Sequence, residues 1–304
     1  MITKAKNEQT DEIKELRRIC FPDEDPRYTD FFFRYIYKPE NCYLYMSGGE
    51  ILSCIIRDVH PLMFNGRVIQ ASMLTGAATR PDVRKNGYMH KLLQVVMDAC
   101  EHSELLTFVQ SEEPDLFEHM GFRRIYKRNV YEISRMDCRR TTNFGINFDP
   151  SAIDLLKVYS AYISRFNGFY TRDLPDFVTR IKEARETGRK IIAYFNGKDQ
   201  IQGYAIMKIN DDCVDIEELT YLSGMALLKL CNTALQEKDK VYLHVSDAED
   251  MNKVFPRASA KEELSAMARL NDAALFSKLY NTKVTDTRDL RAVSLRPLNL
   301  NEKY

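Results

Sequence analysis

The run from residue 68 to residue 110 constrains the fold of this chain more than any other. Residues 68–78 are long and apolar enough for a central strand, and residues 88–100 carry apolar side chains at helical spacing. Residues 105–110 form a short apolar stretch of the kind found in buried strands. A strand, a loop, a helix and a second strand in this order predict a right-handed crossover between parallel strands, with a ligand at their carboxyl ends.

The loop of this crossover is basic and opens the helix. Arg84, Lys85 and Lys91 supply positive charge, and Gly87 lets the main chain approach a ligand closely. The first N–H groups of a helix have no intrahelical partner, and the helix dipole is positive there. The loop therefore predicts either a pyrophosphate-binding cradle or a solvated basic helix start.

Two helices and two hairpins are predicted before the crossover. The pattern indicates helices over 8–20 and 31–37, strands over 42–46 and 51–59, and a tight turn at Asn65-Gly66 that leads into the strand over 68–78.

The second half of the chain repeats this order, which indicates an internal duplication. The repeat comprises a helix over 177–185, strands over 191–195, 201–209 and 213–219, a helix over 223–235 and a strand over 241–245. A further helix is expected over 262–280.

These patterns predict an α/β fold with two tandem domains, each a mixed and mostly antiparallel sheet with one parallel crossover and flanking helices. The expected boundaries are 1–138 for the cofactor-binding domain, 139–285 for its degenerate copy and 286–304 for a C-terminal tail. In the copy, Ser223-Gly224 stands at the cradle position without a basic residue beside it until Lys229, so no cofactor is expected there.

Composition excludes several classes of protein. Lys and Arg number 44 against 44 Asp and Glu, so no general positive field favours nucleic acid or an anionic membrane as partner. The seven cysteines form no Cys-x-x-Cys pair and the five histidines form no cluster, so we expect neither a metal site nor a disulfide framework. Neither a signal core nor an apolar run of membrane-spanning length occurs, and we expect a cytoplasmic protein.

The stretch from Arg84 to Tyr88 resembles motif A of the Gcn5-related N-acetyltransferases (GNAT), Gln/Arg-x-x-Gly-x followed by a small residue, for which this chain has Met89. Residues 116–122, Leu-Phe-Glu-His-Met-Gly-Phe, resemble motif B of the same family. The resemblance implies acetyl-CoA as cosubstrate and acetyl transfer to a primary amine of a small molecule or peptide. It implies a pyrophosphate site at Arg84, Lys85, Asn86, Gly87, Tyr88 and Met89, and pairing of the pantetheine arm with Ala77, Ala78 and Thr79.

Two consecutive acetyltransferase-like domains, the second without a cradle, resemble the enhanced-intracellular-survival family. Members of that family carry a third, sterol-carrier-like domain, for which this chain is too short at full size. Assembly of identical chains stays open.

The catalytic groups implied by the resemblance are only partly present. The family uses a motif B tyrosine as the acid for the leaving thiolate, but Phe117 stands at that position. Tyr126 or Ser111 could supply the proton, water could do so, or catalysis could be weak or absent, which would leave an acyl-CoA-binding regulatory module. The family's base is the C-terminal carboxylate, which would be that of Tyr304 here unless residues 299–303 form a loose tail.

The acceptor site is expected near the first two helices. Glu24, Asp25 and Tyr28 lie where these helices wall the acceptor cleft in the family, and the carboxylates could hold a cationic amine. The alternative is an ordinary solvated loop.

Overall fold

The computed structural model describes residues 1–111, 113–300 and 302. The chain divides into two compact units. The first comprises residues 1–125 and 266–293, and the second comprises residues 126–265 with 294–300 and 302. This division differs from the predicted boundary at 138, because the chain leaves the first unit within one strand and returns to it within another.

The sheet of the first unit follows the order β1-β2-β3-β4-β5-β13. Its strands are β1 (Ile2–Lys4), β2 (Cys42–Ser47), β3 (Glu50–Phe64), β4 (Arg67–Thr79), β5 (Leu106–Val109) and the last residues of β13 (Ser259–Leu270). Among the described pairs of this sheet order, β4 and β5 are parallel, from Ala71 opposite Leu106 to Leu74 opposite Val109, and the others are antiparallel. The predicted crossover is confirmed.

The hairpin of β3 and β4 is the longest feature of this unit. Asn65 and Gly66 form its turn with φ of 44° and 79°, which is the left-handed pair that a type I′ turn requires. Phe64 at the tip packs edge-on against Phe276 and Tyr280, with both ring centroids 5.3 Å away. The returning segment 266–293 thus covers the hairpin tip with α8 (Ala273–Tyr280).

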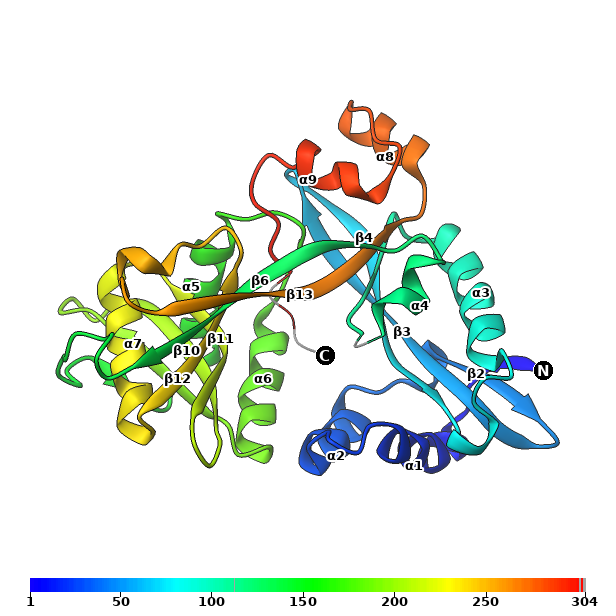
Figure 1. Ribbon diagram of the computed structural model, residues 1–304, viewed down its shortest axis with the longest axis horizontal. Coiled ribbons are helices and arrows are strands. Elements are labelled where there is room, and N and C mark those ends of the chain that lie inside the picture. Colours follow the sequence, from blue (N-terminus) through cyan, green and yellow to red (C-terminus); the bar gives the residue numbers. More distant parts are fainter. Residues whose placement is uncertain (112, 301, 303–304) are drawn as a thin grey trace. The chain divides into compact units, whose positions relative to one another are not determined.

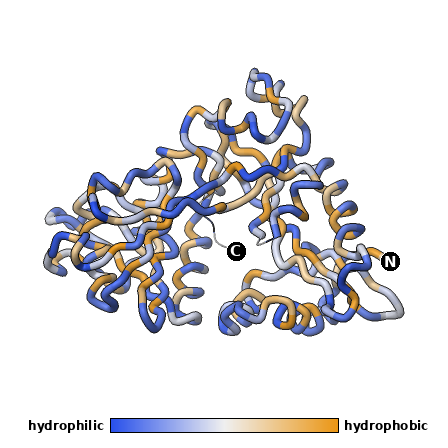
Figure 2. Tube along the Cα trace, in the orientation of Figure 1, coloured by the Kyte–Doolittle hydropathy of each residue, from blue (hydrophilic) through white to orange (hydrophobic). Residues whose placement is uncertain are grey.

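Helices cover both faces of the first sheet (Figure 1). The helices α1 (Thr10–Cys20) and α2 (Pro26–Tyr35) pack Ile13 and Phe32 on one face, where Cys54 and Ile56 of β3 point. The helix α3 (Tyr88–Glu101) covers the other face with the apolar positions that its spacing predicted. Hydrophobic and hydrophilic residues alternate along the helices and strands (Figure 2), as expected for half-buried elements.

Shorter helices complete the described chain. They are α4 (Pro114–Glu118), α9 (Leu290–Val293) and the 3₁₀ turns Asn7–Gln9, Pro39–Asn41, Pro81–Val83, Met251–Lys253 and Thr287–Asp289. Within the described ranges, no helix is long and apolar enough to cross a membrane.

The second unit repeats the architecture of the first. Its sheet follows the order β13-β6-β12-β11-β10-β9-β7, with β11 and β12 parallel. The elements are β6 (Arg123–Ser134), β7 (Ile146–Asn147), α5 (Ala152–Ile163), β8 (Phe169–Tyr170), α6 (Leu174–Glu186), β9 (Lys190–Phe195), β10 (Ile201–Ile209), β11 (Val214–Tyr221), α7 (Gly224–Glu237) and β12 (Lys240–Ser246). The predicted tandem of mixed, mostly antiparallel sheets is confirmed.

The helix expected over 262–280 was wrong in its first half. Residues 259–270 form strand β13, and only Ala273–Tyr280 is helical. The segment is rich in Ala and Glu, which favour helix locally, but pairing of Met267 and Ala268 with β5 buries both side chains completely. Tertiary burial therefore overrides local propensity.

A buried charge cluster holds the tail residue Glu302 in the second unit. Arg172 donates a 2.7 Å hydrogen bond to Glu218 and a 2.9 Å hydrogen bond to Glu302. Arg180 pairs with both carboxylates, at 3.1 Å and 2.5 Å, and the hydroxyl of Tyr204 donates to Glu218. The side chains of Arg172, Glu218 and Glu302 are each at least nine-tenths buried, so each charge is paired as burial demands.

Low pH should destabilise the second unit, because Glu218 becomes protonated. Burial by itself would raise the pKa of this carboxyl, but Arg172 and Arg180 lower it from 4.5 to about 2. The stabilisation is present above pH 4.5 and is lost as the pH falls toward about 2. Hydrogen exchange of β10 and β11 amides, followed by mass spectrometry, should show protection that falls with acid in the wild type.

The variant Glu218→Gln should be less protected at neutral pH, because Arg172 and Arg180 lose a partner, and its protection should change less with acid. Glu186→Gln, at an exposed position in the same unit, serves as the control and should follow the wild type. An equal acid dependence in all three proteins would assign the acid effect to other groups.

Candidate active site

The strand β4 has a bulge at the point where one of its edges becomes open. Gly76 and Ala77 together stand opposite Ile55, and Gly76 adopts a φ of +58°. The parallel pairing of β4 with β5 stops at Leu74 and Val109, before this bulge. Beyond the bulge, β4 continues alone on that side, and a ligand can pair with its backbone there.

Thr79 lies on this open edge. The N–H of Arg80 donates to Leu52 of β3 at 3.0 Å, so by the alternation of antiparallel strands the backbone groups of Thr79 face away from β3. The carbonyl of Thr79 accepts a 3.2 Å hydrogen bond from Nε of Arg84 and a 3.3 Å hydrogen bond from the thiol of Cys20. The predicted pantetheine segment Ala77 to Thr79 is therefore at an edge without a neighbouring strand.

The start of α3 is open to an anion. Gly87 is its N-cap residue, with a φ of +77°, and no side chain caps the helix. Lys85 also has a positive φ, of 67°, so the loop turns sharply before the helix. The N–H groups of the first helical turn are consequently free to bind an anionic group.

Cations surround this helix start. Arg84, Lys85 and Lys91 are exposed, and in the described part of the chain none of them forms an ion pair. Arg80, in contrast, is held by a 2.5 Å ion pair with Glu50. Three unneutralised cations beside uncapped N–H groups are the donor set that a pyrophosphate requires, so the residues present fit the cofactor that the sequence predicted.

The remaining predicted positions shape the loop. The side chain of Asn86 donates a 3.0 Å hydrogen bond to the carbonyl of Val83 and closes the turn. The ring of Tyr88 lies against the ring of Tyr45, with centroids 4.8 Å apart. Met89 is half-buried at the second position of the helix.

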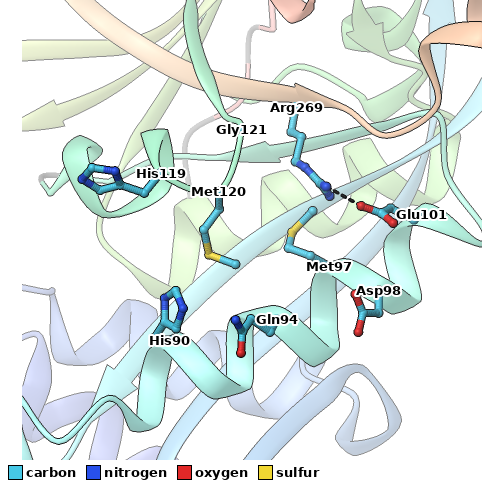
Figure 3. A pocket seen from close by; sticks show the side chains of 9 residues that line it. All are labelled: His90, Gln94, Met97, Asp98, Glu101, His119, Met120, Gly121 and Arg269. Atoms are coloured by element: carbon cyan, nitrogen blue, oxygen red, sulfur yellow. Dashed lines mark hydrogen bonds and ion pairs between the residues drawn. The ribbon is translucent and has the colours of Figure 1, made fainter.

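A groove runs along α3 from this loop (Figure 3). His90, Gln94 and Asp98 form its floor, and the turn after α4 and the side chain of Arg269 form the opposite wall. The cavity measures about 380 Å³, and Arg269 donates to Glu101 at its far end. Arg269 comes from β13, so the returning segment contributes to this groove, which sequence patterns did not indicate.

Phe117 and Ser111 lie near the carboxyl end of β5. Phe117 is 2% exposed and packs edge-on against Phe122 at 5.6 Å, which makes it part of the core. Ser111 lies two residues after the end of β5, and its oxygen accepts the N–H of Glu113 at 3.0 Å. Among the described residues, no acceptor is found for the hydroxyl proton of Ser111.

Tyr126 has a structural partner. Its hydroxyl is buried and donates a 2.9 Å hydrogen bond to the carbonyl of Gly168, and both residues belong to the second unit. Gly168 has a φ of +64° and no room for a side chain, because a Cβ there would overlap the tyrosine hydroxyl. Tyr304, the other predicted catalytic residue, lies outside the described residues.

Two of the predicted acceptor residues, Glu24 and Asp25, form ion pairs with arginines. Glu24 accepts hydrogen bonds from Nε and Nη2 of Arg17 at 2.8 Å and 2.7 Å. Burial alone would raise the pKa of Glu24, but the hydrogen bond and the charge of Arg17 lower it. Asp25 caps α2 and forms a 2.8 Å ion pair with Arg27, and Tyr28 follows in the first turn of that helix.

In the second unit, the start of α7 corresponds to the cradle, and it is capped by a side chain. Ser223 caps α7, because its hydroxyl oxygen accepts the N–H of Ala226 at 3.2 Å. Lys229 points instead to the carbonyl of Thr142, at 2.6 Å. A side-chain cap and the absence of a cation at the helix start leave no anion site like the one at Gly87.

A buried carboxylate joins the carboxyl ends of β11 and β12. Glu249 accepts hydrogen bonds from the hydroxyls of Tyr162 and Tyr221 at 2.8 Å and 2.7 Å, and burial raises its pKa. β11 and β12 stop pairing at Ile216 and Leu243, as β4 and β5 do earlier in the chain. The strands part in both units, but in the second unit side chains of the protein join their ends.

Comparison with known proteins identifies the first unit. The family model of the acetyltransferase (GNAT) domain matches residues 1–125. These residues form a GNAT acetyltransferase domain. No curated protein matches the chain.

Solved structures extend the likeness beyond the GNAT domain. A probable N-acyltransferase from Enterococcus faecalis is 17% identical, with a TM-score of 0.74 over 89% of this chain and 72% of that one. A GCN5-related N-acetyltransferase from Anabaena variabilis is 16% identical, with a TM-score of 0.74 over 90% and 73%. Eis1 from Mycobacterium abscessus is 14% identical, with a TM-score of 0.69 over 90% and 74%. These structures share the fold of this chain beyond residues 1–125, which are the part that the GNAT family model matches.

The variant Tyr126→Phe should separate a structural role from a catalytic one. Loss of the hydroxyl leaves the carbonyl of Gly168 without its donor and should lower the free energy of unfolding by about 1 kcal/mol. Thermal unfolding followed by circular dichroism measures this loss. If the hydroxyl also served as the catalytic acid, the variant would lose turnover while it keeps acyl-CoA affinity.

Proposed function

We propose that this protein transfers an acetyl group from acetyl-CoA to a primary amine of a small molecule or peptide. The observation that carries the proposal is the uncapped start of α3, where Arg84, Lys85 and Lys91 form no ion pair with any described residue. This anion site adjoins the open edge of β4 beyond the bulge at Gly76. The GNAT match over residues 1–125 supports the same class of reaction.

The chain's own groups would hold the cofactor in an extended arrangement. The N–H groups after Gly87 and the cations around them would bind the pyrophosphate, and the backbone of Ala77 to Thr79 would pair with the pantetheine arm. Bound acetyl-CoA would supply an activated acyl thioester. The guanidinium of Arg84 now covers the carbonyl of Thr79, so it would leave that carbonyl when the arm binds.

The groove along α3 would receive the nucleotide end. It starts at His90, in the first turn of the helix, and therefore continues directly from the cradle. Its lining mixes the thioethers of Met97 and Met120 with the amide of Gln94, a combination that suits a flat ring with polar edges.

Proton transfer would rest on Ser111 or on water. Ser111 stands at the carboxyl end of β5, in the same unit as the cradle, and its hydroxyl proton has no described acceptor. A hydroxyl there could donate to the departing thiolate. Most of the amine substrate is protonated at neutral pH, so a base or a water relay is also needed.

A regulatory acyl-CoA-binding module is the second candidate, and Phe117 favours it. This core phenylalanine stands where the family has its catalytic tyrosine, and it has no hydroxyl. A cytoplasmic location, a homo-oligomer and the absence of nucleic-acid and membrane partners stay predictions.

Charge reversal of the cradle tests binding and turnover together. The variant Arg84→Glu with Lys85→Glu should weaken acetyl-CoA binding at least about a hundredfold, because two attractive charges become repulsive. Isothermal calorimetry measures the affinity, and release of free thiol over a panel of amines measures turnover.

The matched control is Lys198→Glu with Lys253→Glu, which makes the same change in net charge at exposed positions of the second unit. This control should bind as the wild type does. Amine-dependent thiol release would establish the transferase, and binding without release over the whole panel would establish the regulatory module. Absence of saturable binding to the wild type would contradict both.

Ser111→Ala should reduce kcat by roughly ten- to a hundredfold with unchanged acetyl-CoA affinity, because a donor to a charged group is lost. Ser111→Thr keeps the hydroxyl and should retain most of the activity. Single-turnover thiol release measures the chemical step in both variants. Equal rates in Ser111→Ala and the wild type would assign the proton to water.

A further inference from the structure

Arg17 is a buried arginine beneath the bulge of β4. It lies in the last turn of α1, its side chain is 8% exposed, and its guanidinium carbon lies 4.5 Å from the centroid of the Phe32 ring. Its bidentate pair with Glu24 is fixed further by Thr29, whose hydroxyl donates to the same carboxylate at 2.7 Å. The pair therefore holds the guanidinium in one orientation.

One nitrogen of this guanidinium has no hydrogen-bond partner. Nε and Nη2 of Arg17 donate to Glu24, but Nη1 is enclosed and has no acceptor among the described residues. Buried donors are rarely left unpaired, because water has been removed and nothing replaces it. Nη1 is enclosed in the free chain, so solvent does not satisfy it, and a ligand oxygen reaches it only when the groups around the bulge move apart.

Gly76 lies next to this nitrogen. A Cβ at Gly76 would lie 3.3 Å from Nη1 of Arg17, which is closer than most such contacts. The positive φ of the bulge and the nearby nitrogen both require glycine at this position. The unpaired donor is consequently at the point where β4 has parted from β5 and its backbone edge has become free.

The charge of the pair indicates which kind of oxygen would bind. Glu24 already balances the positive charge of Arg17, so a ligand carboxylate would add an uncompensated negative charge beside a buried one. A carbonyl oxygen needs only the hydrogen bond. The same contact would strengthen as negative charge develops on that oxygen during acyl transfer.

We propose that Nη1 of Arg17 donates a hydrogen bond to the carbonyl oxygen of the acyl group that is transferred. The proposal rests on the proposed function, because it requires an acyl thioester at the open edge of β4. It makes Arg17 a catalytic residue contributed by α1. It also gives Glu24 the role of holding Arg17, in place of binding the amine.

A pair of ligands isolates this contact. Acetyl-CoA carries the carbonyl oxygen, and the thioether S-ethyl-CoA lacks it but keeps every other group. Calorimetry without an amine should show that the wild type prefers acetyl-CoA by about tenfold, which is the size of one hydrogen bond from a charged donor.

Arg17→Lys removes the donor and keeps the ion pair. An ammonium can bond Glu24 but has no second arm to reach the bulge, so the preference for acetyl-CoA should fall below about twofold while S-ethyl-CoA binds unchanged. Arg57→Lys is the matched control, because Arg57 pairs with buried Glu104 on the other face of the same sheet. The control should retain the full preference. The carbonyl stretch of bound 13C-labelled acetyl-CoA gives a readout apart from affinity and should move toward the free frequency only in Arg17→Lys.

Each outcome decides between the two hypotheses. If the wild type binds neither ligand, the cradle and the proposed function fail before Arg17 is tested. If both ligands bind and Arg17→Lys retains the preference and the carbonyl frequency, the proposal for Arg17 is overturned and the cradle stands. A change confined to the amine KM would assign the donor to the acceptor and would also overturn it. Should Arg17→Lys fail to fold, Arg17→Gln with Glu24→Gln makes the same comparison without a buried charge.

Discussion

The early end of pairing between β4 and β5 is the constraint on which the site depends. After Leu74 and Val109 the two parallel strands no longer bond to each other, and the bulge at Gly76 turns the edge of β4 outward. A strand edge in a protein interior has to find partners for its N–H and C=O groups. In the free chain, Arg84 and Cys20 satisfy one carbonyl of this edge, that of Thr79. A ligand with its own amide groups can replace them.

The two halves of the chain differ by a few side chains at the position where the first has its proposed ligand site. Both have a long strand that parts from its parallel neighbour and a helix that follows it. At the helix start, the first has Gly87 without a cap and the second has Ser223 with one. Between the strand ends, the second has Glu249 bonded by tyrosines. In the second unit, a side-chain cap and a buried carboxylate occupy positions that stay open in the first.

Periodicity predicted most of the architecture, because each amphipathic element packs against the sheet that its pattern implies. The crossover, the hairpin turn at Asn65 and the tandem order were all predicted in this way. The strand over 259–270 was missed because its partners β5 and β6 lie far away in sequence, where local composition carries no information. The burial of Glu302 had no sequence signal for the same reason. The helix α5 was missed although Ser151 caps it and its buried residues recur at helical spacing.

The cradle could be proposed from the sequence because a loop and a helix start lie in one stretch of residues, and its role as a cofactor site stays a prediction. The partners of Glu24 could not be predicted, because a sequence does not show whether a carboxylate contacts a substrate or an arginine. Arg17 lies seven residues before Glu24, and only the structure shows that Arg17 bonds both carboxylate oxygens and leaves one nitrogen beside Gly76. Sites built from one segment can be read from a sequence, and sites built from several require the structure.

The first unit is discontinuous in sequence, and this affects the order in which the chain can fold during synthesis. Residues 266–270 complete its sheet beside β5, and α8 covers the tip of its long hairpin. A ribosome delivers these residues only after the whole second unit has been made. Until then β5 has an unpaired edge and Phe64 is exposed, so the nascent GNAT domain presents the surfaces that chaperones bind. The proposed cofactor site is encoded early in the chain, but the unit that holds it is completed only by residues 266–293.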